Sequence, residues 1–477
     1  MSNEKSENKE NKELREKLLV NRKNGAHVAG KEALGRAEEF CAGYKDFLDA
    51  AKTERESVAE AVRLAEACGF VPFVKGTGYK PGDKVYQNNR DKTITLAVVG
   101  RQPVEQGVHI AAAHIDSPRL DLKPNPLYEN ESLAFLKTHY YGGIKKYQWT
   151  TVPLSLHGVV CKKDGTKVTV SIGEDEGEPK TCVTELLIHL SNEMMNKKAS
   201  EVIPGENMNL LIGSYPYPGD EGSDSVKLNI MNILSEKYGI TEADFVTAEL
   251  EAVPAGKACD IGLDRSMIGA YGHDDRVCSY PSLKALLDLE VPEHAAVCCL
   301  ADKEEIGSYG STGLKARFLE FFIRDLAAGQ GGDEREALQN SRCLSADVSA
   351  AYDPHYADAY EKRNSCFLNG GAVISKYLGG RGKGGSNDAS AEYLAWCGKI
   401  FDDAGVLWQM GELGKVDAGG GGTVASYIAE LGVDTLDLGV PVLSMHSPLE
   451  VVSKLDVYMA YKAIAAFYAV GGNINCQ

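Results

Sequence analysis

The sequence predicts an α/β protein with a mostly parallel central sheet flanked by helices, together with an inserted β-rich domain. In the first and last parts of the chain, apolar strand-like runs such as 93–100 and 294–300 alternate with stretches of helical spacing. From about 126 to 246 the pattern changes to short strands with one polar face, separated by turn residues. This change of pattern predicts that a second domain interrupts the first.

The predicted division is a polar tail over 1–12, a main domain over 13–125 and 247–477, and the insertion over 126–246. The expected elements follow in chain order: helical spacing over 31–69, strands at 93–100 and 108–113, strands at 152–160 and 167–172 within the insertion, a helix after 275, a strand at 294–300, and a closing helix after 453.

The composition argues against nucleic acids and membranes as partners, but it does not bear on whether the protein acts on a small substrate. The chain has 477 residues and a formal net charge of −17. Nucleic acids and anionic membranes attract basic surfaces, so we expect neither as a partner. No apolar run is long enough for a membrane span, and the polar start does not resemble a secretory signal. The 12 cysteines show no CxxC pair with zinc-site spacing, so we expect reduced thiols and a cytoplasmic protein.

Two adjacent carboxylates, Glu304 and Glu305, follow the apolar run 294–300. Acids at the end of a buried strand are costly unless a cation lies beside them. Because neighbouring side chains leaving a strand point in different directions, one acid can bind a metal while the other faces the water that the metal activates. An acidic turn paired with Lys303 is the alternative interpretation of this stretch.

Other polar groups also end apolar runs. His114 and Asp116 form a His-x-Asp pattern in which the carboxylate can orient the imidazole for a metal, and Asp347 and His446 each end a later run. The carboxyl ends of strands in an open α/β sheet are where sites form. A set of imidazoles and carboxylates without cysteine suits zinc, manganese or cobalt, and there are enough groups for two ions that share one carboxylate.

Two further features admit two interpretations. Asp274 and Asp275 stand where a helix begins, and the helix dipole favours carboxylates there, although they could equally bridge metal ions. In the stretch 417–422, glycines including Gly421 and Gly422 would let backbone N–H groups approach a ligand, and a flexible connection is the alternative.

Five short motifs occur in order along the chain: His114–Arg119, His273–Arg276, Asp302–Ser308, Ser345–Asp347 and Leu443–Ser447. Together they resemble the aspartyl aminopeptidase family of metallopeptidases (M18), in a bacterial-type form, within the wider co-catalytic zinc aminopeptidases. The resemblance covers most of the chain. It implies the fold of that family, with the insertion acting as a dimerisation domain.

The resemblance also implies a ligand set for two divalent ions per chain, with zinc expected and manganese or cobalt as alternatives: Asp274 as the bridging carboxylate, His114 and Asp347 on one ion, and Glu305 and His446 on the other. Glu304 would be the general base and Asp116 would orient His114. The implied function is release of N-terminal amino acids from peptides with a free N-terminus, by metal-activated water.

The chain departs from the family at two positions. Tyr147 and Ala350 stand where aspartyl-specific members carry histidines, so the preferred N-terminal side chain of the substrate can differ from aspartate. Lys376 resembles a family lysine near the substrate, so an acidic side chain stays an option. A homo-oligomer built from dimers, up to a dodecamer, is also implied. The alternatives are a related exopeptidase of the deblocking type and a metal-binding assembly protein without catalysis.

Overall fold

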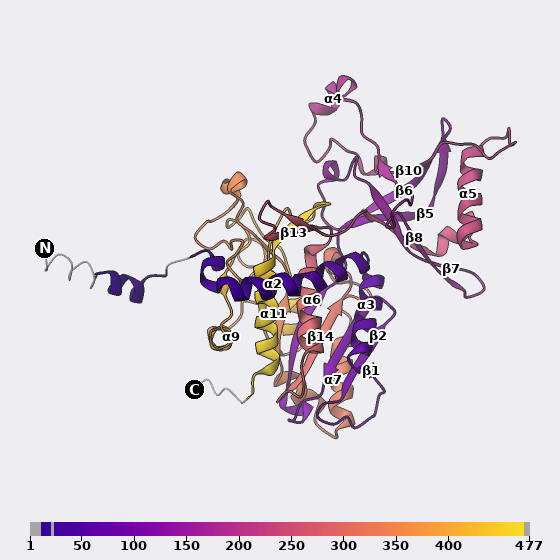
Figure 1. Cartoon of the computed structure of the whole chain (residues 1–477). Helices are drawn as coiled ribbons and strands as arrows, with labels where there is room; N and C mark the ends of the chain where they lie inside the picture. The colour runs from indigo at the N-terminus through magenta and orange to yellow at the C-terminus, as the bar shows by residue number, and fades with distance from the viewer. Residues whose placement is uncertain (1–10, 21–22, 472–477) are drawn as a thin grey trace.

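The computed structural model describes residues 11–20 and 23–471 (Figure 1). Residues 11 to 18 form a short helix, so the last two residues of the predicted polar tail are helical. The rest of that predicted tail, residues 1–10, lies outside the described residues.

A nine-stranded sheet forms the centre of the larger part of the molecule. Its strands, from one edge to the other, are β1 (Val71–Pro72), β2 (Lys84–Asn89), β3 (Thr93–Val98), β14 (Ala295–Ala301), β4 (Val108–His114), β15 (Arg342–Ala346), β19 (Asp434–Gly439), β17 (Ala372–Ser375) and β18 (Trp408–Met410).

The sheet is mixed: five of its eight neighbouring strand pairs are parallel, as the sequence predicts, and three are antiparallel. The four central strands β14, β4, β15 and β19 are mutually parallel. On either side, β2 with β3, β3 with β14, and β17 with β19 pair in antiparallel fashion. Apolar periodicity identifies a strand but carries no information about its direction, and the tight turn between β2 and β3 permits only the antiparallel arrangement.

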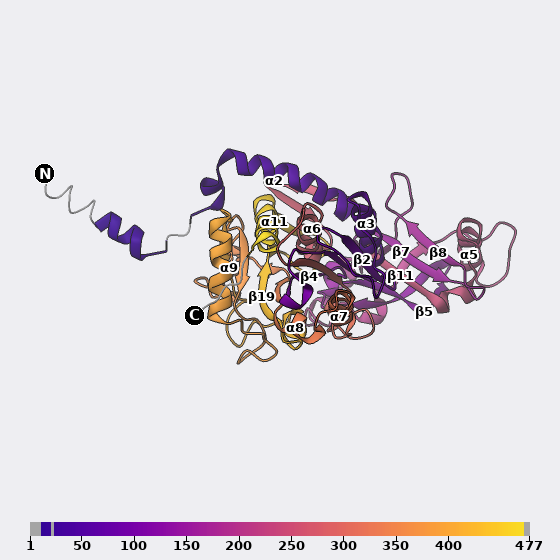
Figure 2. The ribbon, with the colours of Figure 1, turned by 90° about the horizontal axis from the view of Figure 1, so that it is seen from below.

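Helices cover both faces of this sheet (Figure 2). One layer comprises α2 (Gly25–Ala50), α3 (Glu54–Ala67), α6 (His273–Leu287), α9 (Ala391–Asp403) and α11 (Lys454–Ala469). The other comprises α7 (Phe318–Gly329), α8 (Glu334–Gln339) and α10 (Ala425–Ala429). Strand β4 shows the alternation that separates the two layers, since Ala111 and Ala113 pack in the first core and Ile110 and Ala112 in the second.

The predicted helical stretch 31–69 is two helices, α2 and α3. The break falls at Thr53, whose hydroxyl accepts a hydrogen bond from the N–H of Glu56 while the Glu56 carboxylate accepts one from the N–H of Thr53. This reciprocal capping starts a new helix although the apolar spacing continues.

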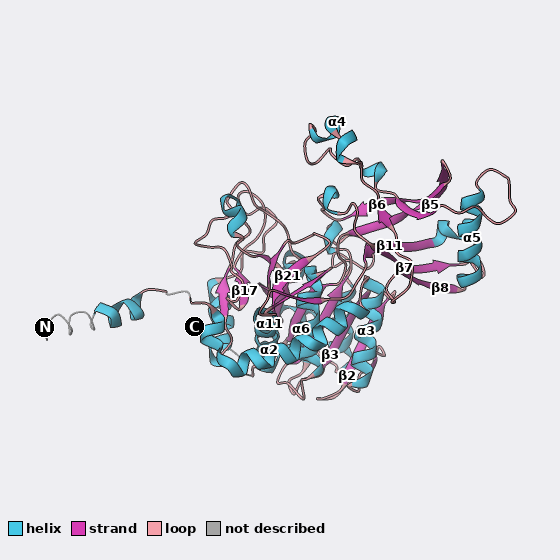
Figure 3. Ribbon diagram, turned by 45° about the horizontal axis from the view of Figure 1, so that its top comes forward, coloured by secondary structure: helices cyan, strands magenta, loops and turns pink. Residues whose placement is uncertain are grey.

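A seven-stranded antiparallel sheet forms the second body of the molecule (Figure 3). Its strands in spatial order are β8 (Lys167–Ile172), β7 (Leu154–Cys161), β11 (Ala248–Pro254), β5 (Arg119–Asn130), β6 (Leu133–Tyr141), β10 (Leu210–Gly213) and β9 (Cys182–Val183). Helix α5 (Ser225–Tyr238) packs on it, the short helix α4 (Asn192–Met195) projects from it, and a separate core forms around Trp149. This sheet begins before the predicted boundary at 126 and ends after the one at 246, and the division into domains stays a prediction.

A third, five-stranded sheet lies close to the carboxyl ends of the central strands: β12 (Cys259–Ile261), β13 (Met267–Ala270), β21 (Glu450–Ser453), β20 (Pro441–Leu443) and β16 (Ser349–Ala350). Within the described residues, none of the helices combines the length and apolar character that crossing a bilayer requires.

A buried ion network joins the first helices to both large sheets. The carboxylate of Glu54, at the start of α3, is fully buried and lies 3.0 Å from Lys92 Nζ and 3.4 Å from Arg119 Nη1. Arg119 begins β5 and lies 3.2 Å from Glu251 on β11. Burial alone would raise the pKa of Glu54, but the charges of Arg119 and Lys92 lower it below its usual range. The network therefore depends on Glu54 being ionised.

We expect Glu54→Gln to lower the free energy of unfolding by about 3–5 kcal/mol, because it leaves Arg119 and Lys92 buried without their shared anion. Urea unfolding followed by circular dichroism measures this loss. As a control, Glu32→Gln removes an exposed pair with Arg36 at 2.7 Å and should cost less than about 1 kcal/mol. Equal effects of the two substitutions would contradict a stabilising role of the buried network.

Candidate metal centre

Three neighbouring parallel strands deliver polar side chains to one edge of the central sheet. In β14 and β4, Ala301 pairs with His114, so the two strands end level with each other. His114 is the last residue of β4, Glu304 and Glu305 begin a 3₁₀ turn after β14, and Asp347 directly follows β15. The structure therefore brings together the strand-end residues on which the sequence-based hypothesis depends.

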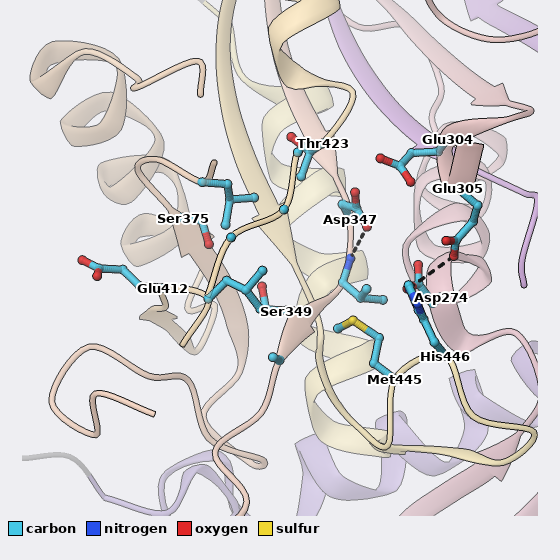
Figure 4. A pocket seen from close by; sticks show the side chains of 17 residues that line it. Asp274, Glu304, Glu305, Asp347, Ser349, Ser375, Glu412, Thr423, Met445 and His446 are labelled. Atoms are coloured by element: carbon cyan, nitrogen blue, oxygen red, sulfur yellow. Dashed lines mark hydrogen bonds and ion pairs between the residues drawn. The ribbon is translucent and has the colours of Figure 1, made fainter. Parts of the chain in front are cut away.

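Two ligand candidates come from other segments. Asp274 is the second residue of α6, directly after the third sheet's strand β13, and His446 lies in the loop between β20 and β21. Figure 4 shows Asp274, Glu305 and His446 beside one another on one side of a pocket, with Asp347 and Glu304 close by.

The first candidate group is His114, Asp274 and Asp347, all buried, with one ligand atom of each lying within 4.8 Å of the others. His114 Nε2 lies 3.1 Å from Asp274 Oδ1 and 3.6 Å from Asp347 Oδ1. One nitrogen and two carboxylate oxygens converge, which is a ligand set that divalent transition metals accept.

The second candidate group is Asp274, Glu305 and His446, under the same 4.8 Å limit. His446 Nε2 lies 3.0 Å from Asp274 Oδ2 and 3.4 Å from Glu305 Oε1. Asp274 thus turns one oxygen toward each imidazole, the geometry of a carboxylate that bridges two ions. Each group has three protein ligands, and catalytic zinc sites typically have three and leave a fourth position for water or substrate.

The negative charge of the buried carboxylates also suits the binding of cations. Burial raises the pKa values of Asp347 and Glu305, and nearby Asp274 raises both further. Burial would lower the pKa of His446, but its contacts with Asp274 and Glu305 raise it to about 10. Asp274 Oδ1 and Glu305 Oε1 are buried without a hydrogen bond from any described residue. Such oxygens are costly unless a cation or donor meets them, so the residues fit a pair of divalent ions.

Asp116 holds the segment that carries the two glutamates. Its carboxylate accepts hydrogen bonds from the backbone N–H groups of Glu304 and Glu305, at 3.0 and 3.2 Å, and from the Tyr141 hydroxyl at 2.8 Å. His114 Nδ1 lies 3.0 Å from the backbone oxygen of Asp116 and 3.4 Å from its carboxylate. Asp116 thus lies beside His114, which it is predicted to orient, and its carboxylate also holds the backbone of Glu304 and Glu305.

Both imidazoles are held in the same way. His446 Nδ1 lies 2.7 Å from the backbone oxygen of Gly143, just as His114 Nδ1 faces that of Asp116. A carbonyl accepts only from N–H, so each ring carries a proton on Nδ1 and directs Nε2 toward the carboxylates, where a metal ion would take the lone pair of Nε2 in place of a proton. The His-x-Asp spacing predicted that the Asp116 carboxylate would orient His114, but the nearer partner of His114 Nδ1 is the backbone oxygen of Asp116. No signal in the sequence pointed to Gly143.

A pocket opens beside the two groups, and Glu304 lines it without belonging to either group. The rest of its wall is made mostly of small, apolar or uncharged residues: Val348, Ser349, Ala350, Ser375, Leu378, Leu413, Gly420, Gly421, Gly422, Thr423 and Met445, together with Glu412. The predicted substrate-facing glycines Gly421 and Gly422 therefore lie at the pocket.

Lys376 and Tyr147 are not among the described residues that line this pocket, whereas Ala350 is. Ser375 lines it instead, at the end of β17, and neighbouring side chains along a strand point to opposite sides. The sequence analysis missed Ser375, Glu412 and Leu413. The alternation along β17 could have favoured Ser375 over Lys376, but nothing in the sequence signalled Glu412 or Leu413.

Comparisons with known proteins agree with this site. The family model described as "Aminopeptidase I zinc metalloprotease (M18)" matches residues 47–468. A probable M18 family aminopeptidase 1 of Clostridium acetobutylicum is 51% identical over 440 residues, covering 90% of this chain and 95% of that protein. A second such protein, from Thermotoga maritima, is 45% identical over 451 residues, covering 94% of this chain and 98% of that protein.

Among solved structures, an M18-family aminopeptidase of Thermotoga maritima superposes with a TM-score of 0.90 at 44% identity, covering 95% of this chain and all of that one. The S. cerevisiae mApe1 dodecamer matches with a TM-score of 0.73 at 21% identity, covering 92% of this chain and 97% of that one, a likeness that speaks for the fold alone. The family model and the identity over nearly the whole chain show that this protein belongs to the M18 family of zinc metalloaminopeptidases.

Proposed function

We propose that the protein is a di-metal aminopeptidase that releases a neutral N-terminal residue from peptides with a free N-terminus. The observation that carries this proposal is the pair of three-ligand groups that share Asp274. Ions bound by His114, Asp274 and Asp347 and by Asp274, Glu305 and His446 would polarise the peptide carbonyl and lower the pKa of a water molecule. Zinc is the first candidate, with manganese and cobalt as alternatives.

Glu304 is the proposed general base. It lies in the pocket outside both ligand groups, and burial raises the pKa of its carboxyl to about 8. A base with a pKa near the working pH can both take and return a proton. Glu304 would take the proton from the attacking water, hold it on its carboxylate, and pass it to the leaving amine. The hydrogen bond from its N–H to Asp116 keeps its backbone in place for both transfers.

The pocket wall supports a preference for neutral side chains. Apart from the metal-ligand groups and Glu304, the only charged residue among the described lining residues is Glu412, whose carboxylate accepts a hydrogen bond from the Tyr377 hydroxyl at 2.6 Å. In Figure 4, Glu412 lies on the side of the pocket opposite the ligand groups. Leu378, Leu413 and Met445 offer apolar contacts, while Glu412 would repel an acidic side chain.

We also propose self-association through the second sheet, in keeping with the dodecameric state of the S. cerevisiae mApe1 structure. The segment before α4 projects from this sheet and exposes Leu187, Ile188 and Leu190, with 57%, 63% and 71% of their surfaces accessible. A cluster of exposed apolar side chains is typical of an interaction site, and a second copy of the chain is the proposed occupant. The relatives are named M18 family aminopeptidases, which favours neither a deblocking aminopeptidase of a related family nor an assembly protein without catalysis.

Glu304→Gln should lower kcat for an aminoacyl-anilide by about 100- to 10,000-fold, because the amide takes no proton from water. Metal analysis by mass spectrometry should still find two ions per chain, since Glu304 belongs to neither group. The exposed Glu290→Gln is the matched control and should keep full activity. Retained turnover in Glu304→Gln, or loss of an ion, would contradict the role of base.

The side-chain preference is tested with leucyl-, methionyl-, aspartyl- and glutamyl-anilides. We expect kcat/KM for leucine to exceed that for aspartate by at least about tenfold, roughly 1.4 kcal/mol. Glu412→Gln should reduce the difference in kcat/KM between the leucyl and aspartyl substrates, because it removes the repulsion between Glu412 and an acidic substrate side chain. Lys376→Gln should leave this difference unchanged. Faster cleavage of the aspartyl substrate, with loss of that activity in Lys376→Gln, would instead support the acidic preference and the substrate role of Lys376.

The double variant Leu187→Ser with Ile188→Ser should shift the protein to smaller species in analytical ultracentrifugation. Leu263→Ser, at a fully exposed leucine on the turn between β12 and β13, is the control and should leave the assembly unchanged. An unchanged sedimentation coefficient in the double variant would locate the interface elsewhere.

A further inference from the structure

Glu450, the first residue of β21, is a carboxylate next to the metal centre that belongs to neither ligand group. It is 1% exposed. No lysine or arginine among the described residues forms an ion pair with it, which is unusual for a carboxylate so deeply buried. A buried carboxylate without a cationic partner calls for another explanation.

Its two oxygens accept hydrogen bonds from the backbone of two candidate metal ligands. Glu450 Oε2 accepts from the N–H of Asp274 at 3.0 Å, and Glu450 Oε1 accepts from the N–H of His446 at 2.7 Å. Asp274 and His446 are distant in sequence, and Glu450 connects them directly. A carboxylate has two acceptor oxygens and no donor, so it matches two N–H groups as no neutral side chain of this size does.

The scaffold that carries Glu450 is rigid. Strand β21 pairs with β13 in antiparallel register, with Glu450 opposite Ala270, and β13 leads directly to Asp274. On its other side β21 pairs with β20, which leads to His446. Both ligand segments therefore leave the same small sheet and meet at one side chain on its middle strand.

Glu450 contacts two of the three candidate ligands of the second group, Asp274 and His446, but only the shared Asp274 of the first group. Asp274 and His446 are two of the three ligands in the second group, whereas His114 and Asp347 of the first group are held elsewhere, by the backbone oxygen of Asp116 and by the N–H of Val348. We propose that Glu450 is a positioning residue that sets the backbone of Asp274 and His446 and thereby the affinity of the second metal ion. This inference rests on the proposed two-ion function.

The test is a titration of metal-free protein with cobalt, followed by absorption spectroscopy, and with zinc against a competing chelator. Glu450→Gln keeps the shape but has one acceptor oxygen, and its amide NH₂ would oppose the second N–H. We expect the second ion to bind about 10- to 100-fold more weakly, as is usual when a partner that orients a ligand is lost. The first ion should lose less affinity, because Asp274 is the one residue of its group that Glu450 contacts.

Asp456 provides a matched control. It is fully buried and accepts hydrogen bonds from two backbone N–H groups, those of Asn369 and Gly371, both at 2.7 Å, but it contacts no candidate ligand. Asp456→Asn should lower the thermal unfolding temperature and leave both metal affinities unchanged. If Glu450→Gln does not fold, Glu450→Asp keeps the charge but is one methylene too short to reach both N–H groups, and we expect the same selective loss.

The outcomes separate the two proposals. A wild-type protein that binds fewer than two ions overturns the two-ion function and this inference with it. Two ions in the wild type and unchanged affinities in the Glu450 variants overturn the role of Glu450 alone. An equal loss at both ions would overturn the selective effect on the second ion, and the same loss in Asp456→Asn would mean that Glu450 acts only on general stability.

Discussion

The burial of many carboxylates at one edge of the central sheet is the constraint on which the rest of the site depends. Asp116, Asp274, Asp275, Glu305, Asp347 and Glu450 are shielded from water, and the imidazoles of His114 and His446 lie among them. Such an arrangement is stable only where hydrogen-bond donors and cations meet the oxygens. The fold supplies backbone N–H groups to some of them, and the oxygens that lack a donor include Asp274 Oδ1 and Glu305 Oε1 in the candidate ligand groups and Asp275 Oδ1 next to them.

Backbone groups do most of the positioning. Asp116 and Glu450 each accept two N–H groups from residues at the centre, and each imidazole faces a backbone carbonyl through Nδ1. Each of these two carboxylates thereby fixes the backbone of two residues of the centre at once. Residues outside the two candidate ligand groups thus hold the backbone of residues within them.

The second sheet takes part in this arrangement. Tyr141, the last residue of β6, donates to Asp116, and the backbone of Gly143 faces His446. Gly142 between them has φ +74°, and a side chain there would approach Glu305 to 3.2 Å, so glycine lets this loop pass close to the ligands. The body that carries the proposed self-association surface is therefore mechanically connected to both ligand groups.

The sequence by itself determined the α/β class, the strand-end positions of His114, Glu304, Glu305 and Asp347, and the family, because apolar periodicity and residue type are local properties. His446, also expected at the end of a central strand, lies instead in the loop after β20 of the third sheet. It could not determine strand direction or which side of β17 faces the pocket, since strand pairing depends on partners elsewhere in the chain. The break between α2 and α3 has a local signal, the capping pair Thr53 and Glu56, which the sequence analysis missed. Only the tertiary structure decided that Ser375, Glu412 and Leu413 form the pocket wall, and that Gly143 and Glu450 hold ligands from distant segments, because those contacts exist only once the three sheets have come together.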